Sequence, residues 1–408
     1  MVVLILPQHQ TSIKLNKERE MLPFSIISNT NVIPKVSIQS WDVGNNSIGL
    51  VTASGDLYFT GDNTYGQFGN GTTTSPGAGN WIKSSMTGVQ SVWMCKGYTT
   101  VILKKDGTAW YCGRIQSTSI SLFGVSGQSS GTYSNWIQIT SGLPVTANLI
   151  KQIFLCGYYT IIVTIDGLLY MSGVNSVGNF GNGTTNGTSA FTLIPFSQTT
   201  PVQKAIGTSN VTFNGSYACT TILTKDGRVF NAGNNYYLKC FNNFNYRSSN
   251  YTSFQDSGLT GIVDIDAEEQ FYVSTTSDGG LWATGYAGNL MSGNSSMNTR
   301  FAASGYHKIV STLYWAFSLN STGTAGFGLG YSNGTPILND NTAKTSFGVL
   351  ANKGAPSGLP TDIKATSNKN IVLLYNTNGV VKIYAVGPIV GQGSISNAGF
   401  LQVPNPPF

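Results

Sequence analysis

The acidic residues of this chain are the first candidates for chemistry, because carboxylates bind cations and transfer protons. The densest acidic segment is VDIDAEEQ, in which Asp264, Asp266 and Glu268 would share one face of a β-strand and Glu269 follows. The segment has two interpretations, an ion-binding site or a solvated loop. We expect the loop.

A second set of carboxylates precedes glycine at Asp106, Asp166, Asp226 and Asp278. These residues could form a ring that binds calcium or acts in acid–base catalysis. Each Asp could instead accept hydrogen bonds within its own tight turn. We expect the second role, because one active site would not need a copy in every repeat.

Other catalytic patterns are weak. The chain has two histidines, His9 and His307, and neither lies in a cluster of metal-binding residues. Five cysteines form no CxxC pair, which favours small buried side chains over a zinc or redox site. They are Cys95, Cys112, Cys156, Cys219 and Cys240. We predict a protein that is not an enzyme, with no catalytic residue, no metal and no cofactor.

The elements that would position these residues are repeated β-hairpins. A short β-rich run leads to an Asp-Gly, Thr-Gly or Asn-Gly dipeptide, and a second β-rich run ends on glycine. Such a dipeptide between apolar runs predicts a β-hairpin, because these residues tolerate positive φ. The seven copies are Ser47–Gly61, Thr99–Gly113, Thr160–Gly173, Cys219–Gly233, Phe271–Gly285, Trp315–Gly328 and Ile371–Gly387.

Turn glycines mark the period of the repeat. They are Gly55, Gly107, Gly167, Gly227, Gly279, Gly323 and Gly379. Successive turn glycines lie 44 to 60 residues apart. A unit of this length with several strands indicates a propeller, and no long helical pattern occurs. We predict an all-β protein, a seven-bladed β-propeller.

The run from Thr52 to Gly71, TASGDLYFTGDNTYGQFGNG, carries a more specific pattern, and DGLLYMSGVNSVGNFGNG from Asp166 to Gly183 is a second copy. Both resemble the repeat of the regulator of chromosome condensation (RCC1-like) family, a hairpin followed by a glycine-rich loop. The resemblance covers roughly residues 34–408 and weakens in the last two copies. It implies a seven-bladed propeller that acts as a signalling scaffold or as a guanine-nucleotide exchange factor for a small GTPase.

The two ends of the chain are similar to the two halves of the connector between repeats. GFLQVPNPPF matches the first half of NWIKSSMTGVQSVWMCKG, and VIPKVSIQSWDVG matches the second half. We therefore expect strands from the N- and C-termini to complete one blade and close the ring. Residues 1–33 fall outside the repeats, so we predict an N-terminal arm at 1–33 and a propeller domain at 34–408.

Composition limits the partners of the chain. Charged residues make up 9%, against about 25% in a typical soluble domain, and the net charge of +6 is spread thinly. Without a clustered basic stripe we expect no nucleic acid partner. No stretch reaches the roughly 18 apolar residues that span a bilayer, and the N-terminus lacks the features of a signal peptide. We expect no membrane insertion and no cleaved signal.

An Asn- and Tyr-rich segment interrupts one repeat between Asn234 and Phe254. Tyr and Asn on exposed loops suit recognition of glycans or proteins, and the alternative is simple loop packing. We predict a contact surface made by Tyr236, Tyr237, Phe241, Phe244, Tyr246 and Tyr251.

Low charge, loops rich in Asn, Gly, Thr and Ser, and the predicted arm together favour a structural or attachment protein at the virion surface. Such a protein would be a bacteriophage tail, collar or capsid-surface component, made in the host cytoplasm. Its partners would be other virion proteins, held by the arm, and a host-surface glycan or protein. Two alternatives stay open: a glycan-binding adhesin or lectin-like propeller, and an RCC1-like scaffold or guanine-nucleotide exchange factor.

Overall fold

The computed structural model describes most of the repeat region. The described residues are 37–94, 98–115, 123, 130–140, 143–208, 217–236, 250–268, 271–285, 295–302, 305–312, 315–320, 326–330, 344–349, 360–366, 370–387, 389 and 400–407. Contacts group Pro34–Phe408 into one compact unit. The predicted N-terminal arm, with His9, lies outside the described residues.

The described strands form seven four-stranded antiparallel sheets, called blades 1 to 7 in chain order. Blade 1 consists of β1 (Ile38–Gly44), β2 (Ser47–Thr52), β3 (Leu57–Gly61) and β4 (Gly77–Lys83), and blade 2 of β5 (Val89–Met94), β6 (Thr99–Lys104), β7 (Ala109–Ile115) and β8 (Gly131–Gln138). Blade 3 consists of β9 (Ile150–Leu155), β10 (Tyr159–Thr164), β11 (Leu169–Gly173) and β12 (Thr188–Leu193), and blade 4 of β13 (Val202–Thr208), β14 (Cys219–Thr224), β15 (Val229–Asn234) and β16 (Asn250–Asp256).

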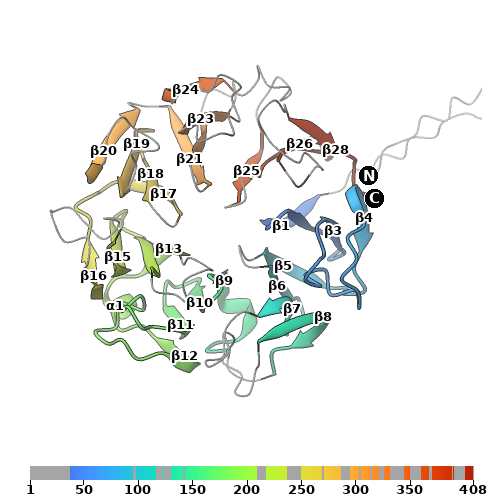
Figure 1. Ribbon diagram of the computed structural model, residues 1–408, viewed down its shortest axis with the longest axis horizontal. Helices are drawn as coiled ribbons and strands as arrows, with labels where there is room; N and C mark the ends of the chain where they lie inside the picture. The colour runs from blue at the N-terminus through green and yellow to red at the C-terminus, as the bar shows by residue number, and fades with distance from the viewer. Residues whose placement is uncertain are drawn as a thin grey trace, which may run out of the picture. The chain divides into compact units, whose positions relative to one another are not determined.

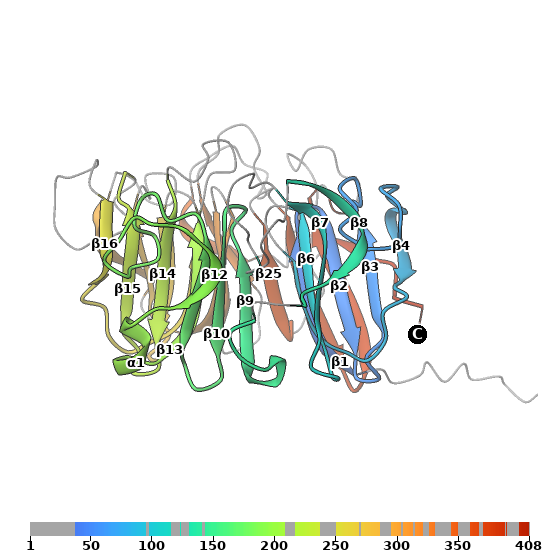
Figure 2. The same cartoon turned by 90° about the horizontal axis from the view of Figure 1, so that it is seen from below.

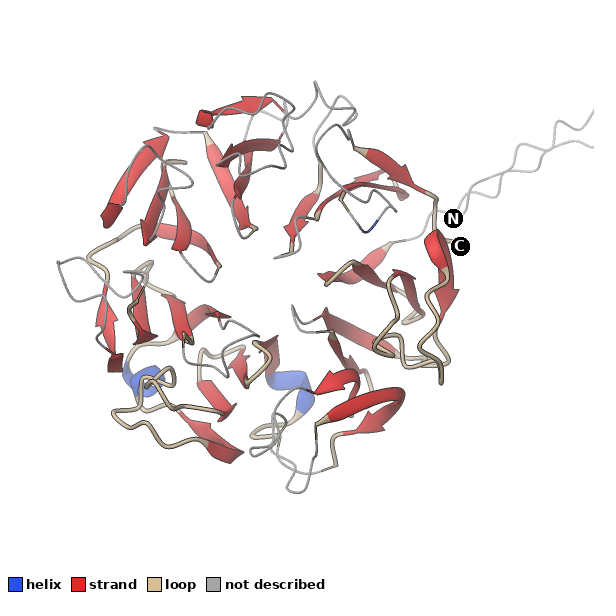
Figure 3. Ribbon diagram, viewed as in Figure 1, coloured by secondary structure: helices blue, strands red, loops and turns tan. Residues whose placement is uncertain are grey.

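Blade 5 consists of β17 (Ile262–Ala267), β18 (Phe271–Thr276), β19 (Leu281–Gly285) and β20 (Ser295–Ala302). Blade 6 consists of β21 (Tyr306–Ser311), β22 (Trp315–Asn320), β23 (Gly326–Gly330) and β24 (Lys344–Val349). Blade 7 consists of β25 (Asp362–Ala365), β26 (Ile371–Thr377), β27 (Val380–Val386) and β28 (Leu401–Val403). A 3₁₀ turn (Ala147–Leu149) and the four-residue helix α1 (Phe196–Thr199) are the helical elements with described bounds, and Figure 3 shows how little helix accompanies the strands.

The blades are arranged around a central axis, with the first strand of each blade nearest the centre (Figure 1). Each blade therefore has an inner strand, a central hairpin and an outer strand. The second strands are almost entirely buried, as in β2 and β10, because neighbouring blades cover both of their faces. The prediction of an all-β propeller is confirmed.

The predicted hairpins coincide with the second and third strands of the blades. Six of the turn glycines have φ between 79° and 103°, the left-handed region that glycine occupies without steric cost: Gly55, Gly107, Gly167, Gly227, Gly279 and Gly379. Gly323 lies outside the described residues. The hairpin turns are therefore set locally, by a glycine at one position of each repeat.

The connections of a blade emerge at two opposite ends. The hairpin turns and the connectors between blades lie at one end, here called the turn face, and α1 lies there at the lower edge of Figure 2. The connections from first to second strand and from third to fourth strand lie at the other end, here called the loop face.

The glycine-rich loop after β3 belongs to blade 1 and packs against blade 2. Asn63 is fully buried, and its amide donates to the carbonyl oxygens of Thr72 (3.1 Å) and Thr74 (3.3 Å), while its oxygen accepts from the backbone N–H of Phe68 (2.9 Å). A side chain at Gly69 would meet the indole of Trp136 in the outer strand of blade 2 at 2.4 Å. The glycine is needed here because the loop lies directly on the next blade.

Blade 3 repeats this arrangement on blade 4. Asn175 donates to the carbonyl oxygens of Thr184 (3.0 Å) and Asn186 (3.2 Å), and accepts from the N–H of Phe180 (2.8 Å). A side chain at Gly181 would meet the ring of Phe254 at 2.4 Å. The glycines of this motif thus serve contact between blades.

The predicted closure of the ring by a shared blade is wrong. Blade 1 contains only residues near the N-terminus, and β28 pairs with β27 in blade 7, with Val403 opposite Ile383. The connector runs from the outer strand of one blade to the inner strand of the next, so its two halves belong to different blades. The C-terminal segment, which resembles the first half, therefore forms the outer strand of blade 7, and the N-terminal segment, which resembles the second half, forms the inner strand of blade 1.

Side chains close the ring between blades 7 and 1. One buried apolar cluster contains Trp41 and Ile48 from blade 1 together with Val372 and Ile383 from blade 7. The indole N–H of Trp81, in β4, donates to the carbonyl oxygen of Pro404 (2.7 Å), directly after β28. The two ends of the chain are thus joined by packing and not by a sheet.

We expect Asn63→Ala to lower the free energy of unfolding by about 2–4 kcal/mol, because it leaves buried carbonyl and N–H groups of the loop without partners. Urea unfolding monitored by circular dichroism measures this change. Thr73→Ala, at an exposed position of the same loop, is the matched control and should change stability by less than about 0.5 kcal/mol. Equal effects of the two substitutions would contradict the role of Asn63.

The turn carboxylates give a prediction at acid pH. Hydrogen bonds from Thr108 and Lys104 lower the pKa of Asp106 from 3.8 to about 2, and bonds from Thr276, the Gly280 N–H and Arg300 do the same for Asp278. Because these pKa values are depressed, the carboxylates stabilise their turns above pH 3.8, and the effect disappears as pH falls through about 2. Carboxyl NMR titration should find both groups ionised at pH 3, and Thr108→Val should raise the pKa of Asp106.

Candidate functional site in the central channel

A cavity of about 250 Å³ lies on the axis of the propeller. Inner strands from all seven blades line it, so the ring of blades itself creates the site. Its polar lining residues are Asp42, Gln152, Lys204, Asp266, Lys308 and Lys364. Within β1, β9 and β17, polar residues alternate with buried apolar ones, because the strand turns one face to the channel and the other into its blade.

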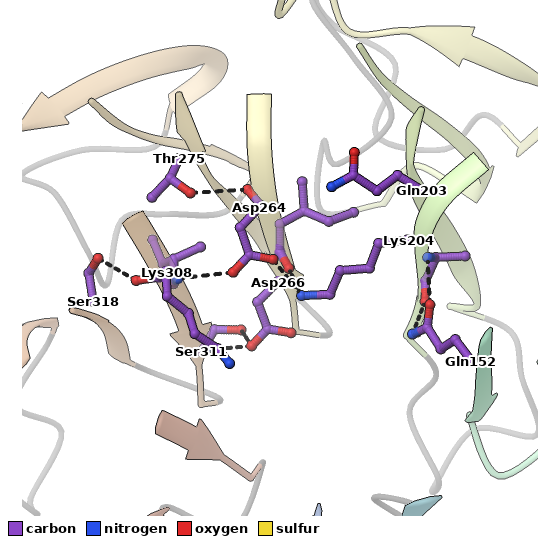
Figure 4. Close-up of polar contacts among 12 residues, drawn as sticks. Gln152, Gln203, Lys204, Asp264, Asp266, Thr275, Lys308, Ser311 and Ser318 are labelled. Carbon is purple, nitrogen blue, oxygen red and sulfur yellow. Dashed lines mark hydrogen bonds and ion pairs between the residues drawn. The ribbon is translucent and has the colours of Figure 1, made fainter. Parts of the chain in front are cut away.

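Three lysines of the lining form ion pairs with the blade that follows them. Lys204 Nζ lies 2.7 Å from Asp264 Oδ1, and also donates to the carbonyl oxygen of Ile265 (2.7 Å), as Figure 4 shows. Lys308 pairs with Asp362, and Lys364 Nζ lies 2.8 Å from Asp42 Oδ1, across the junction between blades 7 and 1. The cations of the channel therefore connect neighbouring inner strands.

Carboxylates and amides make a second set of contacts between blades. Asp42 Oδ2 accepts from the N–H of Met94 (2.8 Å), and Gln152 accepts from the N–H of Ala205 (3.1 Å) and donates to its carbonyl oxygen (2.9 Å). Asp264 Oδ2 accepts from the N–H of Ile309 (3.2 Å). These side chains satisfy backbone groups at the inner edge of the following blade, where no further strand pairs.

The acidic segment of the sequence is part of this arrangement. Asp264 and Asp266 lie on β17 and face the channel, whereas Glu268 is buried just after the strand. The expectation of a solvated loop is therefore wrong, because the segment continues a strand in which Asp264 has partners in blades 4 and 6 and Asp266 has a partner in blade 6. Within the described residues no group of three His, Cys, Asp or Glu side chains is placed to hold a metal ion. Glu269 lies outside the described residues.

The charge at the junction of blades 7 and 1 is concentrated around Lys364. Burial lowers the pKa of its ammonium, but the carboxylates of Asp42, Asp362 and Asp266 raise it above its ordinary value. Lys364 also lies over the ring of Trp41, 5.4 Å from the centroid, and the Trp41 indole N–H donates to Asp362 (2.8 Å). The raised pKa keeps the Lys364 ammonium protonated at neutral pH.

The part of the lining that comes from blades 2 and 3 is mainly apolar. Trp93 and Phe154, from the inner strands of blades 2 and 3, are both half-buried and both line the cavity. Met94, Ile153 and Leu155 complete this arc. The channel is therefore ionic on one side and aromatic on the other.

The other predicted chemical residues serve structure where they are described. Each Asp of the Asp-Gly turns bonds within its own turn, as in the bond from the Thr108 N–H to Asp106 (2.9 Å), which confirms the structural interpretation. Cys112, Cys156 and Cys219 are buried and form no disulfide within the described part of the chain, and burial raises the pKa of the Cys112 thiol. Cys95 and Cys240 lie outside the described residues. His307 is an exposed residue of β21.

The predicted aromatic contact surface is described in part. Tyr236 is 48% exposed on the loop face of blade 4, and Tyr251 lies on β16 and packs against Cys219. The remaining predicted residues, Tyr237, Phe241, Phe244 and Tyr246, lie outside the described residues. The structure therefore brings one exposed aromatic residue of the predicted set to the loop face and turns a second toward the blade.

Sequence reasoning missed two groups of residues. The channel lysines and the aspartates Asp42 and Asp362 were not predicted, whereas Asp264 and Asp266 were predicted to lie on a solvated loop. A cluster of Tyr65, Tyr98 and Arg114 at the loop face of blades 1 and 2 was not predicted either. Polar residues at alternate positions of the inner strands, as in SWDVG, were the available signal for the first group. The second group comes from two connections and the end of β7, so no local pattern marks it.

We expect Lys364→Met to destabilise the protein by about 1–3 kcal/mol, because Asp42 would keep a partly buried charge without its cation. Thermal unfolding of the variant and of Asp42→Asn, alone and combined, forms a double-mutant cycle. The combined loss should be clearly smaller than the sum. Lys104→Met, which breaks the exposed pair with Asp106, is the control and should cost at most about 0.5 kcal/mol. Additivity in the first cycle would contradict a direct interaction.

Comparison with known structures identifies proteins of similar fold. No family model matches the chain. The crystal structure of Prp20p from Saccharomyces cerevisiae superimposes with a TM-score of 0.66 at 15% identity, covering 86% of each chain. Yeast RCC1 (Prp20) bound to Kap60 gives 0.62 at 12% identity, covering 81% of this chain and 78% of that one. Human WBSCR16 gives 0.60 at 15% identity, covering 80% and 85%. In fold, the chain is an RCC1-like β-propeller.

Proposed function

We propose that this protein is a non-enzymatic interaction module that binds another protein through the loop face of its propeller. The observation that carries the proposal is a cluster of two tyrosines and an arginine at that face. The cluster is made by Tyr65, Tyr98 and Arg114. Tyr and Arg are the residue types that most often dominate the affinity of protein interfaces.

The geometry of this cluster suits recognition. The rings of Tyr65 and Tyr98 lie 4.4 Å apart, and the guanidinium of Arg114 lies 4.8 Å from the Tyr65 ring centroid. All three side chains are half-buried, so each has a packed side and an accessible side. Packing of the three side chains on one another restricts their rotamers, which reduces the entropy lost on binding.

The backbone of this cluster is unusual. Tyr98 has φ of 70°, a conformation that a bulky residue adopts only when its surroundings impose it. Its carbonyl oxygen accepts a hydrogen bond from the N–H of Arg114 (3.0 Å), which fixes the two residues relative to each other. Strain of this kind concentrates at binding sites, and it supports a functional role for Tyr98.

A second aromatic pair lies on the same face at blade 4. The rings of Tyr217 and Tyr236 lie 5.2 Å apart, and the Tyr236 N–H donates to the side chain of Asn234 (2.8 Å). This pair includes the exposed member of the predicted contact surface. Two aromatic groups on one face favour a partner that covers several blades.

A guanine-nucleotide exchange factor for a small GTPase is the second candidate. The supporting observation is the fold likeness to Prp20p, whose structure was described together with its binding properties to Gsp1p and histones. At this level of identity the likeness concerns the fold, and function on a propeller depends on the residues of its faces. Exchange activity is therefore a special case of the proposed protein binding.

The virion role, with an N-terminal arm holding other virion proteins and a host-surface glycan or protein as target, stays a prediction, as do the lectin-like alternative and the virion location. No helix among the described residues is long and apolar enough to cross a membrane.

We expect a photo-crosslinking residue at position 65 to form protein adducts in cells that produce this protein. The same residue at position 54, on the turn face, is the matched control and should form few. Arg114→Ala should reduce the adducts at position 65 at least fivefold, because it removes the cation packed on the ring. Mass spectrometry identifies the partner, and fluorescent-nucleotide release from candidate small GTPases tests the exchange activity.

Equal adduct formation at positions 65 and 54, or none at either, would contradict binding through the loop face. Adducts at position 65 without stimulated nucleotide release would support the interaction module and reject exchange activity on the GTPases tested.

A further inference from the structure

The charges of the central channel do not balance. The inner strands that surround it carry four aspartates, Asp42, Asp264, Asp266 and Asp362, and three lysines in direct ion pairs, Lys204, Lys308 and Lys364. Each lysine is matched to a different aspartate. Lys151, on β9, is exposed, donates to the carbonyl oxygen of Gln203 (2.8 Å) and does not line the cavity. Asp266 is the carboxylate left without a cation in contact.

Only one of the two carboxylate oxygens of Asp266 accepts hydrogen bonds within the described part of the chain. Its Oδ2 accepts from the Ser311 N–H (2.6 Å) and from the Ser311 hydroxyl (3.0 Å), as Figure 4 shows. Its other oxygen has no hydrogen-bond or ion-pair partner within the described part of the chain. Two neutral donors fix the orientation of the carboxylate and leave its negative charge in the cavity.

The aromatic side of the channel supplies the second half of a binding site. Trp93 is half-buried, and no acceptor for its indole N–H is found among the described residues. Phe154, on the next inner strand, adds a second aromatic surface to the cavity lining. An aromatic wall favours apolar groups and also attracts cations through its π-face.

From the single free carboxylate, the aromatic wall and the size of the cavity, we propose that the channel binds a small organic cation, a protonated amine with an aromatic or apolar body. The ammonium would lie at the free oxygen of Asp266, and the body would pack on Trp93 and Phe154. The volume of about 250 Å³ lies just below the range of pockets for drug-sized ligands, so the ligand is small.

The charge of the channel lining disfavours anionic and neutral ligands. An anionic ligand would approach a lining whose lysines already hold carboxylates and whose remaining charge is negative. A neutral ligand would leave Asp266 in the cavity without a cation in direct contact. A monovalent cation therefore matches the channel in sign and in magnitude. This site is independent of the loop-face partner, because it uses residues of the inner strands alone.

The test is isothermal titration calorimetry of the full chain with 2-phenylethylamine at pH 7, together with quenching of tryptophan fluorescence. We expect binding in the micromolar to millimolar range and at least tenfold weaker binding of 3-phenylpropionate, which has a similar body and the opposite charge. Asp266→Asn should weaken amine binding at least tenfold. Its amide oxygen can still accept from Ser311, so the channel should stay folded.

Two further variants keep the result interpretable. Trp93→Leu should weaken amine binding and remove the ligand-dependent fluorescence change. Asp278→Asn, a carboxylate change in a hairpin turn outside the channel, is the matched control and should bind as the unchanged protein does. Absence of amine binding at 10 mM (roughly the weakest affinity that such a small ligand would show), equal binding of the amine and the carboxylate, or unchanged binding in Asp266→Asn would each overturn the proposal.

Discussion

The unpaired inner edge of each blade is the constraint on which this structure depends. A four-stranded sheet has two edges, and the inner edges converge on the axis, where no further strand can pair with them. The chain satisfies part of these edges with side chains, since Asp42, Gln152 and Asp264 each accept from a backbone N–H of the following blade. The polarity of the channel is therefore first a consequence of building a ring from separate sheets.

The same solution fixes neighbouring blades relative to each other. A side chain that bonds the backbone of the next inner strand sets both the spacing and the register of two sheets. The ion pairs of Lys204, Lys308 and Lys364 act between other pairs of blades in the same way. At the outer side, the glycine-rich loops after β3 and β11 rest on Trp136 and Phe254 of the next blade. Contact between blades is thus made both near the axis and near the rim.

Local features of the sequence were enough to predict the hairpins and the fold class. A glycine at positive φ, such as Gly107, has a purely local cause and leaves a local mark in the sequence. Side chains that join blades have partners far away along the chain: Lys204 meets Asp264 sixty residues later, and Lys364 meets Asp42 over 322 residues. No pattern within one repeat identifies such pairs, which is why the channel was not predicted.

The predicted closure failed for a related reason. Similarity of the chain ends to the connector was real, but the sequence does not show where a connector passes from one blade to the next. The contact of Trp81 with Pro404 and the cluster around Trp41 depend on the three-dimensional ring. The channel carboxylates show the same limit, because an Asp in a strand has the same sequence signature whether it faces solvent or another blade.

The side-chain junction between blades 7 and 1 gives the ring one seam that differs from all the others. Every other pair of consecutive blades is also joined by the continuous polypeptide, whereas this pair is joined only by packing and by contacts such as Lys364 with Asp42. Under tension applied to its two ends, the ring would part at this seam before any single sheet lost a strand. The resistance of the ring to pulling therefore depends on the apolar cluster around Trp41, on hydrogen bonds such as that from Asn370 to Asn46, and on the Lys364–Asp42 ion pair.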